Sequence, residues 1–433
     1  MNSLIYCYWT VAILAIYFMF LLMQKRYRLL QPSVIHTAIW LVTVVLIIFE
    51  LNGFLVSDQQ DDIKFRFVSK FICFMMLSSV IGFVLAHFFT SREETNLKIE
   101  LIEIEVIDAI LTKFKWIPYL CGFIGILLFV FIISSIGNWS TFSEYRSFAL
   151  STERIGYAAF AQRISGHVNV LGMLYLMLLG YKYGREGIHL LSLFKYAFLC
   201  SIINMSIGGR VWIVTSILPI MVTYTFCRHY SSSNNKSRIR SDNRKIIAIL
   251  VFVLFAFSFI GILRSGAGKS NAIEEQNYVD KLLYLTDGSK ITNMVLSQYP
   301  PGTFNLEYGK SEFLSNFINS PMMQKFNESI EHNIGLLVTV KSVMPNLYFD
   351  FGFWGGIIMW GIFCFFLEFI CIRLKYRVKI IPLLFVGVLS LFMFQSPITN
   401  IFSLNVPRLE WIMIIYLFRK RIFRGIIGIE KYI

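Results

Sequence analysis

Charged residues are scarce in this chain. Only 15% of its 433 residues are Asp, Glu, Lys or Arg, whereas 56% are hydrophobic. Because no single buried core would hide that much apolar surface, a soluble globular domain is excluded. Cysteine is scarce as well, and all seven cysteines lie in or beside long apolar stretches. The outer polar segments contain no cysteine, so a disulfide framework and a cysteine-ligated zinc site are excluded too.

The abundant feature is a series of apolar stretches of about 17 to 23 residues, each long enough to cross a ~30 Å hydrocarbon core as a helix. They predict an all-α, polytopic integral membrane protein with about 11 transmembrane helices. Arg408 and Glu410 interrupt the last stretch, which makes it the weakest. The predicted spans are residues 4–23, 34–56, 69–90, 117–136, 163–181, 190–207, 210–227, 246–263, 351–372, 380–397 and 403–418.

Basic residues gather in every second polar segment. Of the 40 Lys and Arg residues, 24 lie in the segments of one side, and only six lie in the short segments of the other side. The positive-inside rule therefore places the N-terminus outside and the C-terminus in the cytoplasm. The net charge of +14 reflects this topology, and nucleic acid is not an expected partner. The first span has no basic segment before it and no small-residue cleavage pattern, so we expect it to remain as an anchor.

The polar segments differ in length, which divides the chain into three parts. Residues 1–263 hold the first eight spans and an outer segment at 137–162, and residues 347–433 hold the last three spans and the cytoplasmic C-terminus. Residues 264–346 form a large outer loop, far longer than a connector needs. Such a loop is either a binding lid or a small domain. The inner segment 97–115 mixes strand-like and helical spacing, so its periodicity does not decide its structure.

Three arginines lie where spans begin or end on the outer side. Arg210 follows the glycines at 208–209 between two spans, Arg264 directly follows a span, and Arg163 opens a span with His167 four residues later. A guanidinium group donates two parallel hydrogen bonds and so suits phosphate. Together the three groups fit the pyrophosphate of a lipid-linked substrate. The alternative is that each arginine reaches to lipid headgroups and marks only a helix end.

Two residues are candidates for accepting a proton. His332 is the single histidine of the large outer loop and has Glu331 beside it, and Asp350 lies at the outer boundary where the chain re-enters the membrane. The structural alternatives are an ordinary loop histidine and a helix N-cap. Tyr348 and Trp354, which flank Asp350, are either stacking surfaces for a substrate or interfacial belt residues.

Two segments resemble a cofactor site or a metal site, but neither has the residues that such a site requires. The segment 265–270 resembles a phosphate-binding loop, but Leu263 stands where that motif requires glycine. Asp58, Asp61 and Asp62 lack Asp-X-Asp spacing and a nearby histidine, so a solvated acidic turn is the better interpretation. We therefore expect neither a metal nor a cofactor.

The chain resembles the O-antigen polymerases, which join oligosaccharide repeat units in bacterial surface polysaccharide synthesis. The likeness lies in the span layout with two larger outer loops, in Gly-Gly-Arg at 208–210, in Arg264 after a span, and in Tyr-Phe-Asp-Phe-Gly-Phe-Trp-Gly-Gly at 348–356. The arginine-rich outer segment of the family is similar to residues 146–163 here. The spacing from Arg163 or Arg264 to the following glycines departs from the family pattern.

The resemblance implies a fold like that of the C-type glycosyltransferases and a location in the bacterial inner membrane with a periplasmic N-terminus. It also implies an undecaprenyl-pyrophosphate-linked oligosaccharide as substrate, membrane lipid as surroundings, and a flippase and a chain-length regulator as partners in the same pathway. In that interpretation Arg210, Arg264 and Arg163 stabilise the leaving pyrophosphate without a metal, and Asp350 or His332 activates the acceptor hydroxyl. The residues assigned to substrate binding are Arg163, Arg146, Arg154, His167, Tyr348 and Trp354.

Three alternatives remain. An O-antigen ligase would share the topology and the donor but transfer the glycan to the lipid A core. A flippase or other transporter would usually show repeat symmetry and charges deep within spans, whereas Glu50 and Glu368 lie near span ends. A membrane scaffold of a polysaccharide assembly complex would not need the outer arginines.

Overall fold

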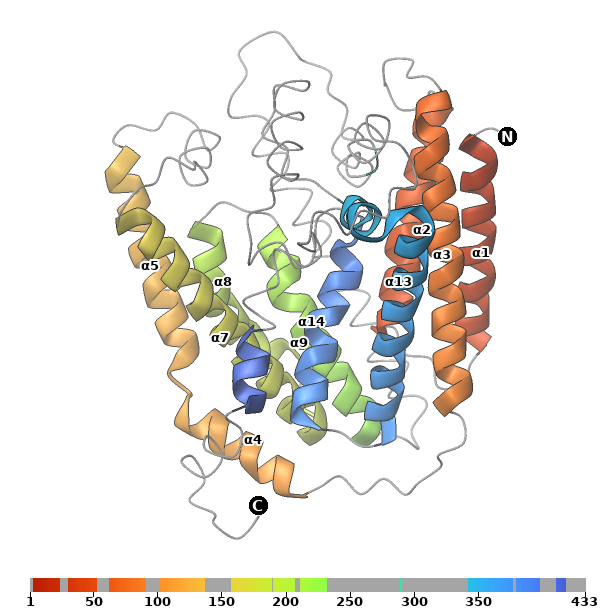
Figure 1. Ribbon diagram of the computed structural model, residues 1–433. Coiled ribbons are helices and arrows are strands. Elements are labelled where there is room, and N and C mark those ends of the chain that lie inside the picture. The colour runs from red at the N-terminus through yellow and green to blue at the C-terminus, as the bar shows by residue number, and fades with distance from the viewer. Residues whose placement is uncertain are drawn as a thin grey trace. The chain divides into compact units, whose positions relative to one another are not determined.

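The described part of the chain is helical. The computed structural model describes residues 3–23, 30–52, 62–90, 101–136, 157–188, 190–206, 211–231, 289, 342–376, 379–397 and 410–417. Within these ranges every regular element is a helix and no strand occurs (Figure 1). The predicted all-α class is thereby confirmed for these residues.

Six helices in these ranges are long and apolar enough to cross a membrane. Large hydrophobic side chains lie on their surfaces, as at Ile16, Phe88 and Phe123, which are 71%, 71% and 60% exposed. So much exposed apolar surface suits lipid and not water. The protein is therefore a multi-pass membrane protein. The six candidate spans are Ser3–Leu21, Pro32–Leu51, Arg66–Thr90, Glu105–Ser134, Ile164–Glu186 and Phe351–Leu374.

Three further predicted spans correspond to shorter apolar helices, at Phe194–Ile203, Ile217–Cys227 and Ile380–Gln395. The predicted span at 246–263 lies outside the described residues, and only 410–417 of the last predicted span is described. The total of about 11 spans, which follows from the lengths of the apolar stretches, stays a prediction.

The chain divides into two compact units. The first consists of residues 1–96, 276–376 and 392–406, and the second of residues 97–275, 377–391 and 407–433. Each unit therefore combines segments that are distant in the sequence. The predicted outer loop at 264–346 lies outside the described residues, apart from Ser289 and residues 342–346.

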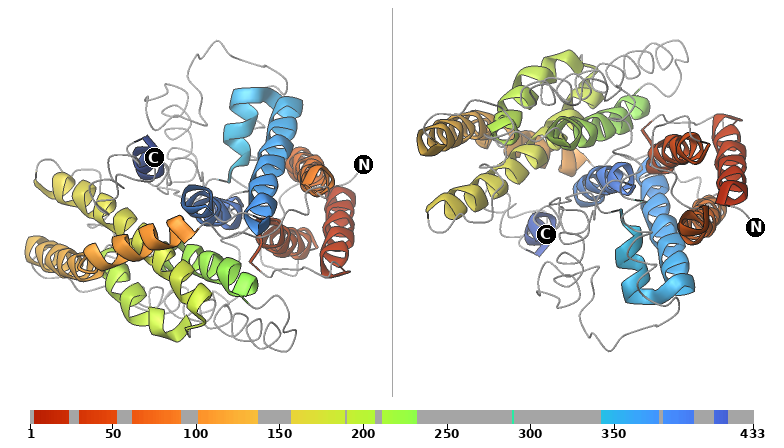
Figure 2. Two further views of the ribbon diagram at one scale, coloured as in Figure 1. Left: turned by 90° about the horizontal axis from the view of Figure 1, so that it is seen from below. Right: turned by 90° about the horizontal axis from the view of Figure 1, so that it is seen from above.

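The first unit contains four long helices side by side, as Figures 1 and 2 show. Their largest fully buried side chains include Trp40, Phe71, Phe83 and Trp360. The helix α2 begins with proline at its first position, where a missing N–H costs nothing and the fixed φ suits a helix. The four helices are α1 (Ser3–Met23), α2 (Pro32–Leu51), α3 (Asp62–Thr90) and α13 (Met344–Tyr376).

Small residues let α3 and α13 approach closely. A Cβ atom on Gly82 of α3 would strike the backbone oxygen of Gly361 on α13, and a Cβ atom on Gly361 would strike Ser78. Ser78 and Gly82 are four residues apart and so lie on one face of α3. This is the small-xxx-small arrangement by which helices pack in membranes, where no hydrophobic force drives them together.

A residue beyond α14 (Ile380–Gln395) ties two helices of the first unit together. Trp40 Nε1 on α2 donates a hydrogen bond to Ser396 Oγ at 2.8 Å. The Val343 N–H, which directly precedes α13, donates to the Ser396 carbonyl at 3.0 Å. The start of α13 is thereby held by contacts from three segments of the chain.

The second unit is also helical. The inner segment 97–115, whose sequence spacing fits both a strand and a helix, contains the helix Leu101–Lys113. The helix α7 ends with Gly187 at φ 75°, and the Ile188 N–H donates to the Tyr183 carbonyl at 3.0 Å, which is a Schellman C-cap. The elements are α4 (Leu101–Lys113), α5 (Ile117–Ile136), α7 (Tyr157–Glu186), η1 (Leu190–Leu193), α8 (Phe194–Ser206), α9 (Val211–Ser231), residues 380–391 of α14 and the helical residues 410–417.

Glycine also brings the helices of the second unit together at α7. A Cβ atom on Gly172 would lie 2.7 Å from Cys121 Sγ on α5 and 3.1 Å from Cys200 Sγ on α8. A Cβ atom on Gly180 would lie 2.9 Å from Thr223 Oγ1 on α9. All seven cysteines of the chain are buried and none is in a disulfide, as expected from their positions in the apolar stretches.

The Gly82 contact yields a test of the packing. We expect Gly82→Ala to destabilise the protein by about 1 to 3 kcal/mol, the usual cost of overpacking, because the new methyl group meets a backbone atom that cannot rotate away. Gly166→Ala is the matched control, since a Cβ atom there meets nothing within 4 Å. Thermal unfolding of the detergent-solubilised protein measures both, and equal midpoints for the two variants would contradict the packing.

Candidate functional site

The structure describes only some of the site residues that the sequence predicts. Arg163 and Asp350 lie on the described helices α7 and α13, but their side chains are not described. The side chains of His167, Tyr348 and Trp354 are described. The residues that lie outside the described ranges are Arg146, Arg154, Arg210, Arg264 and His332.

The motif at 348–356 forms a bend at the start of α13. Gly352 has φ 68° and ψ −172°, a conformation that side-chain-bearing residues avoid, and it separates a short helical segment from the long one. A Cβ atom on Gly356 would lie 2.9 Å from the Leu347 carbonyl oxygen, so the two segments touch backbone to backbone. Asp350 lies on the short segment, two residues before the bend. The backbone geometry therefore explains two glycines of the motif, Gly352 by its positive φ and Gly356 by its close contact with Leu347.

An aromatic cluster surrounds this bend. Tyr348 is 4% exposed, and its ring meets Phe67 of α3 edge-on with centroids 5.8 Å apart. Trp354 is 58% exposed and contacts Phe74 at 5.4 Å. Tyr348 therefore packs inside the first unit, whereas Trp354 keeps a surface that lipid or a substrate can reach. The aromatic cluster consists of Phe67, Phe71, Phe74, Tyr348, Phe353 and Trp354.

The first turns of α7 carry a histidine that is held in one tautomer. Trp411 Nε1 donates a hydrogen bond to His167 Nδ1 at 3.2 Å, and the rings meet near-perpendicularly with centroids 6.3 Å apart. Because Nδ1 accepts, the neutral ring carries its proton on Nε2. His167 is exposed, so this Nε2–H is a donor available to a ligand. Arg163 precedes His167 by one helical turn on the same face.

Sequence reasoning identified His167 but missed Trp411. The two residues are 244 positions apart, and Trp411 lies in the segment that appeared weakest as a span. The one available signal was the placement of an aromatic residue with a polar N–H directly after Glu410 near a span boundary, a position typical of interfacial tryptophan.

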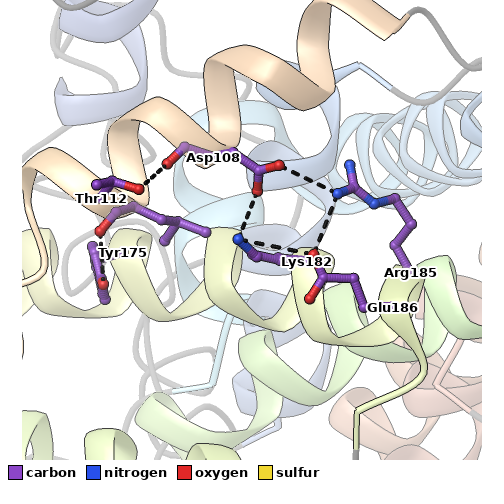
Figure 3. Close-up of polar contacts among 7 residues, drawn as sticks. Asp108, Thr112, Tyr175, Lys182, Arg185 and Glu186 are labelled. Carbon is purple, nitrogen blue, oxygen red and sulfur yellow. Dashed lines mark hydrogen bonds and ion pairs between the residues drawn. The ribbon is translucent and has the colours of Figure 1, made fainter.

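The opposite end of α7 carries a charged cluster, drawn in Figure 3. Asp108 of α4 lies 3.0 Å from Lys182 Nζ and 3.4 Å from Arg185 Nη2, and Glu186 contacts both basic residues at 3.8 and 3.5 Å. Tyr175 donates to the Leu111 carbonyl at 3.2 Å. These contacts attach α4 to α7. Partly exposed pairs of this kind contribute up to about 1 kcal/mol each, so the charged cluster serves docking.

The described residues offer no metal site. No group of three or more His, Cys, Asp or Glu side chains converges within the described ranges. The acidic residues Asp58 and Asp61 lie outside them, and Asp62 begins α3 without a described side chain.

Comparison with protein-family models, with curated proteins and with solved structures finds no match for this chain. The class of the protein therefore rests on its own sequence and structure. In its described part it is an all-α, multi-pass membrane protein.

Chemical modification tests the His167–Trp411 contact. We expect Trp411→Phe to raise the rate at which diethyl pyrocarbonate modifies His167, because the reagent attacks an unprotonated ring nitrogen and the indole N–H occupies Nδ1. Mass spectrometry of the purified protein measures the rate. Trp116→Phe, which changes an exposed tryptophan elsewhere in the second unit, is the control. An unchanged rate in Trp411→Phe would contradict the contact.

Proposed function

We propose that the protein is an inner-membrane glycosyltransferase that polymerises undecaprenyl-pyrophosphate-linked oligosaccharide repeat units into O-antigen or a related surface polysaccharide. It spans the membrane about 11 times, in keeping with the lengths of its apolar stretches. The N-terminus lies in the periplasm and the C-terminus in the cytoplasm, as the positive-inside rule predicts. Its substrate is lipid-linked, and a flippase and a chain-length regulator of the same pathway are its partners.

The observation that supports this proposal best is the donor pair at the start of α7. His167 is exposed and held by Trp411 with its proton on Nε2, and Arg163 lies one turn away. Histidine and arginine are both N–H donors, and the charge pattern assigns this end of α7 to the outer side. N–H donors bind phosphate oxygens, and a donor held in one tautomer needs no rearrangement when the ligand arrives.

The reaction joins an acceptor hydroxyl to the anomeric carbon of the donor sugar while the lipid pyrophosphate leaves. Negative charge grows on the leaving group, and Arg210, Arg264 and Arg163 stabilise it in place of a metal. Asp350 or His332 accepts the proton of the hydroxyl.

Two further groups of residues bind the substrate. Arg146 and Arg154 of the outer segment contact it with His167, and the aromatic surface of Trp354 receives the sugars, whereas Tyr348 packs inside the first unit. Of these two rings, Trp354 has the larger exposed surface, so it is the better stacking platform.

Other functions predict different outcomes. A ligase uses the same donor but acts on the lipid A core, and a flippase moves the donor without forming a glycosidic bond. A scaffold has no need of the outer arginines. Elongation of glycan by the detergent-solubilised protein without an ion gradient would exclude both the flippase and the scaffold.

The surface-polysaccharide ladder of cells with the gene deleted tests the proposal. Complementation with wild type should restore a long ladder, whereas Arg210→Ala and Arg264→Ala should leave one repeat unit on the core. Losing one charge-stabilising donor costs about 10²-fold or more in rate. We expect His167→Ala to shorten the ladder and His167→Gln to preserve part of it, because the glutamine amide can replace the Nε2–H donor.

Arg228→Ala is the matched control, an arginine of the last turn of α9 on the side assigned to the cytoplasm. Quantitative immunoblotting of membranes shows that each variant inserts. A full-length ladder in both Arg210→Ala and Arg264→Ala would contradict the arginine mechanism. A deletion strain with no repeat unit at all would point to a ligase or a flippase instead.

A further inference from the structure

A fully buried carboxylate lies in the first unit, two turns before the end of α13. The Glu368 side chain has no exposed surface. Gln31 Nε2 donates a hydrogen bond to Glu368 Oε1, and His87 Nε2 lies 3.2 Å from the same oxygen. His87 belongs to the last turn of α3 and keeps 21% of its side-chain surface exposed. An ionisable group inside a span is costly, which makes it a functional candidate with a named partner.

Two atoms of this contact have no hydrogen-bond partner among the described residues, Glu368 Oε2 and His87 Nε2. Tyr17 of α1 lies beside Ser33 of α2 and within electrostatic range of Glu368. Ser33 and His36 lie one turn apart on α2. The group thus gathers polar side chains from α1, α2, α3 and α13 in one region.

The two histidines of this region differ in their access to water. His36 is fully buried, with Phe83 and Trp360 ring centroids 5.5 and 5.8 Å away. Trp360 Nε1 donates to His36 Nε2 at 3.4 Å, so the proton of the neutral ring lies on Nδ1. A second proton there would be an unpaired buried charge. His87, which has exposed surface, is therefore the histidine that can exchange a proton with water.

A purely structural ion pair does not account for these contacts. A buried pair offsets its desolvation cost only when the remaining lone pairs are hydrogen-bonded as well. Gln31 and His87 both contact Oε1 of Glu368, whereas Oε2 has no partner among the described residues. Adding a proton to the carboxylate removes the buried charge and with it most of that cost.

We propose that Glu368 and His87 form a proton-binding site, in which Glu368 stores the proton and His87 delivers it. His87 Nδ1 takes a proton from water, the proton on Nε2 passes to Glu368 Oε1, and the imidazole is neutral again while the carboxylate has become a carboxylic acid. The positive-inside pattern places this end of α3 at the cytoplasm. The site depends on contacts of the first unit alone and does not rest on the proposed glycosyl transfer.

The other ionisable groups that face Glu368 do not compete for this proton. Tyr17 faces it from α1, and Cys364 lies one turn earlier on α13. Cys371 lies three residues later on the same helix. Phenol and thiol groups already carry their protons near neutral pH. Gln31, which directly precedes α2, does not ionise. The two groups left to carry the proton in the proposed site are Glu368 and His87.

Infrared difference spectroscopy on the purified full-length protein tests the site. Spectra recorded between about pH 5 and about pH 8, the range in which histidine titrates, should contain the carbonyl band of a protonated carboxylic acid. We expect Glu368→Gln to lose this band, since the amide keeps the shape and hydrogen bonding but cannot titrate. Glu50→Gln, at a second buried carboxyl group of the first unit, is the matched control and should retain the band.

His87→Gln provides a second test, which stays decisive if Glu368→Gln does not fold. It leaves the carboxyl group in place and removes the delivering imidazole, so the pH midpoint of the band should shift. A titrating band of wild-type intensity and midpoint in Glu368→Gln would overturn the proposal. An unchanged midpoint in His87→Gln would overturn it equally.

Discussion

The close approach of α3 to α13 is the constraint on which the first unit depends. At Gly82 and Gly361 the two backbones meet with no side chain between them, which is how helices gain dispersion energy inside a membrane. The two helices run parallel from this contact. The aromatic cluster forms along one end of the seam, and the Glu368–His87 site forms along the other. A side chain at either glycine would therefore disturb both.

The second unit uses the same principle around α7. Gly172 leaves room for two cysteine thiols of neighbouring helices, and Gly180 leaves room for Thr223 of α9. Polar contacts then lie at the two ends of α7, with His167 and Trp411 at one end and the charged cluster at the other. This distribution follows from the cost of burying polar groups, which is lowest where a helix leaves the hydrocarbon region.

The cost of burying charged groups also decides where the two proposed sites lie. A pyrophosphate is large and strongly charged, so its donors must lie where a lipid-linked molecule can reach them, as exposed His167 does. A proton is small enough to reach a carboxylate that has no exposed surface, provided that a partly exposed histidine lies beside it. Glu368 lies near the end of a span, as the sequence indicates, yet its burial is complete. Position along a span and depth of burial are therefore separate properties.

The sequence by itself determined the helical class, most of the described spans and the placement of the cysteines, because the length and composition of an apolar stretch depend on neighbouring residues alone. It also singled out the motif at 348–356 and His167. Only the tertiary structure decided that Gln31 meets Glu368, 337 positions away, and that Trp411 meets His167, 244 positions away. A membrane helix is apolar on every side, so periodicity does not reveal which face meets which neighbour. Small residues such as Ser78 and Gly82 carry part of that information, but the partner they select is set by shape complementarity in three dimensions.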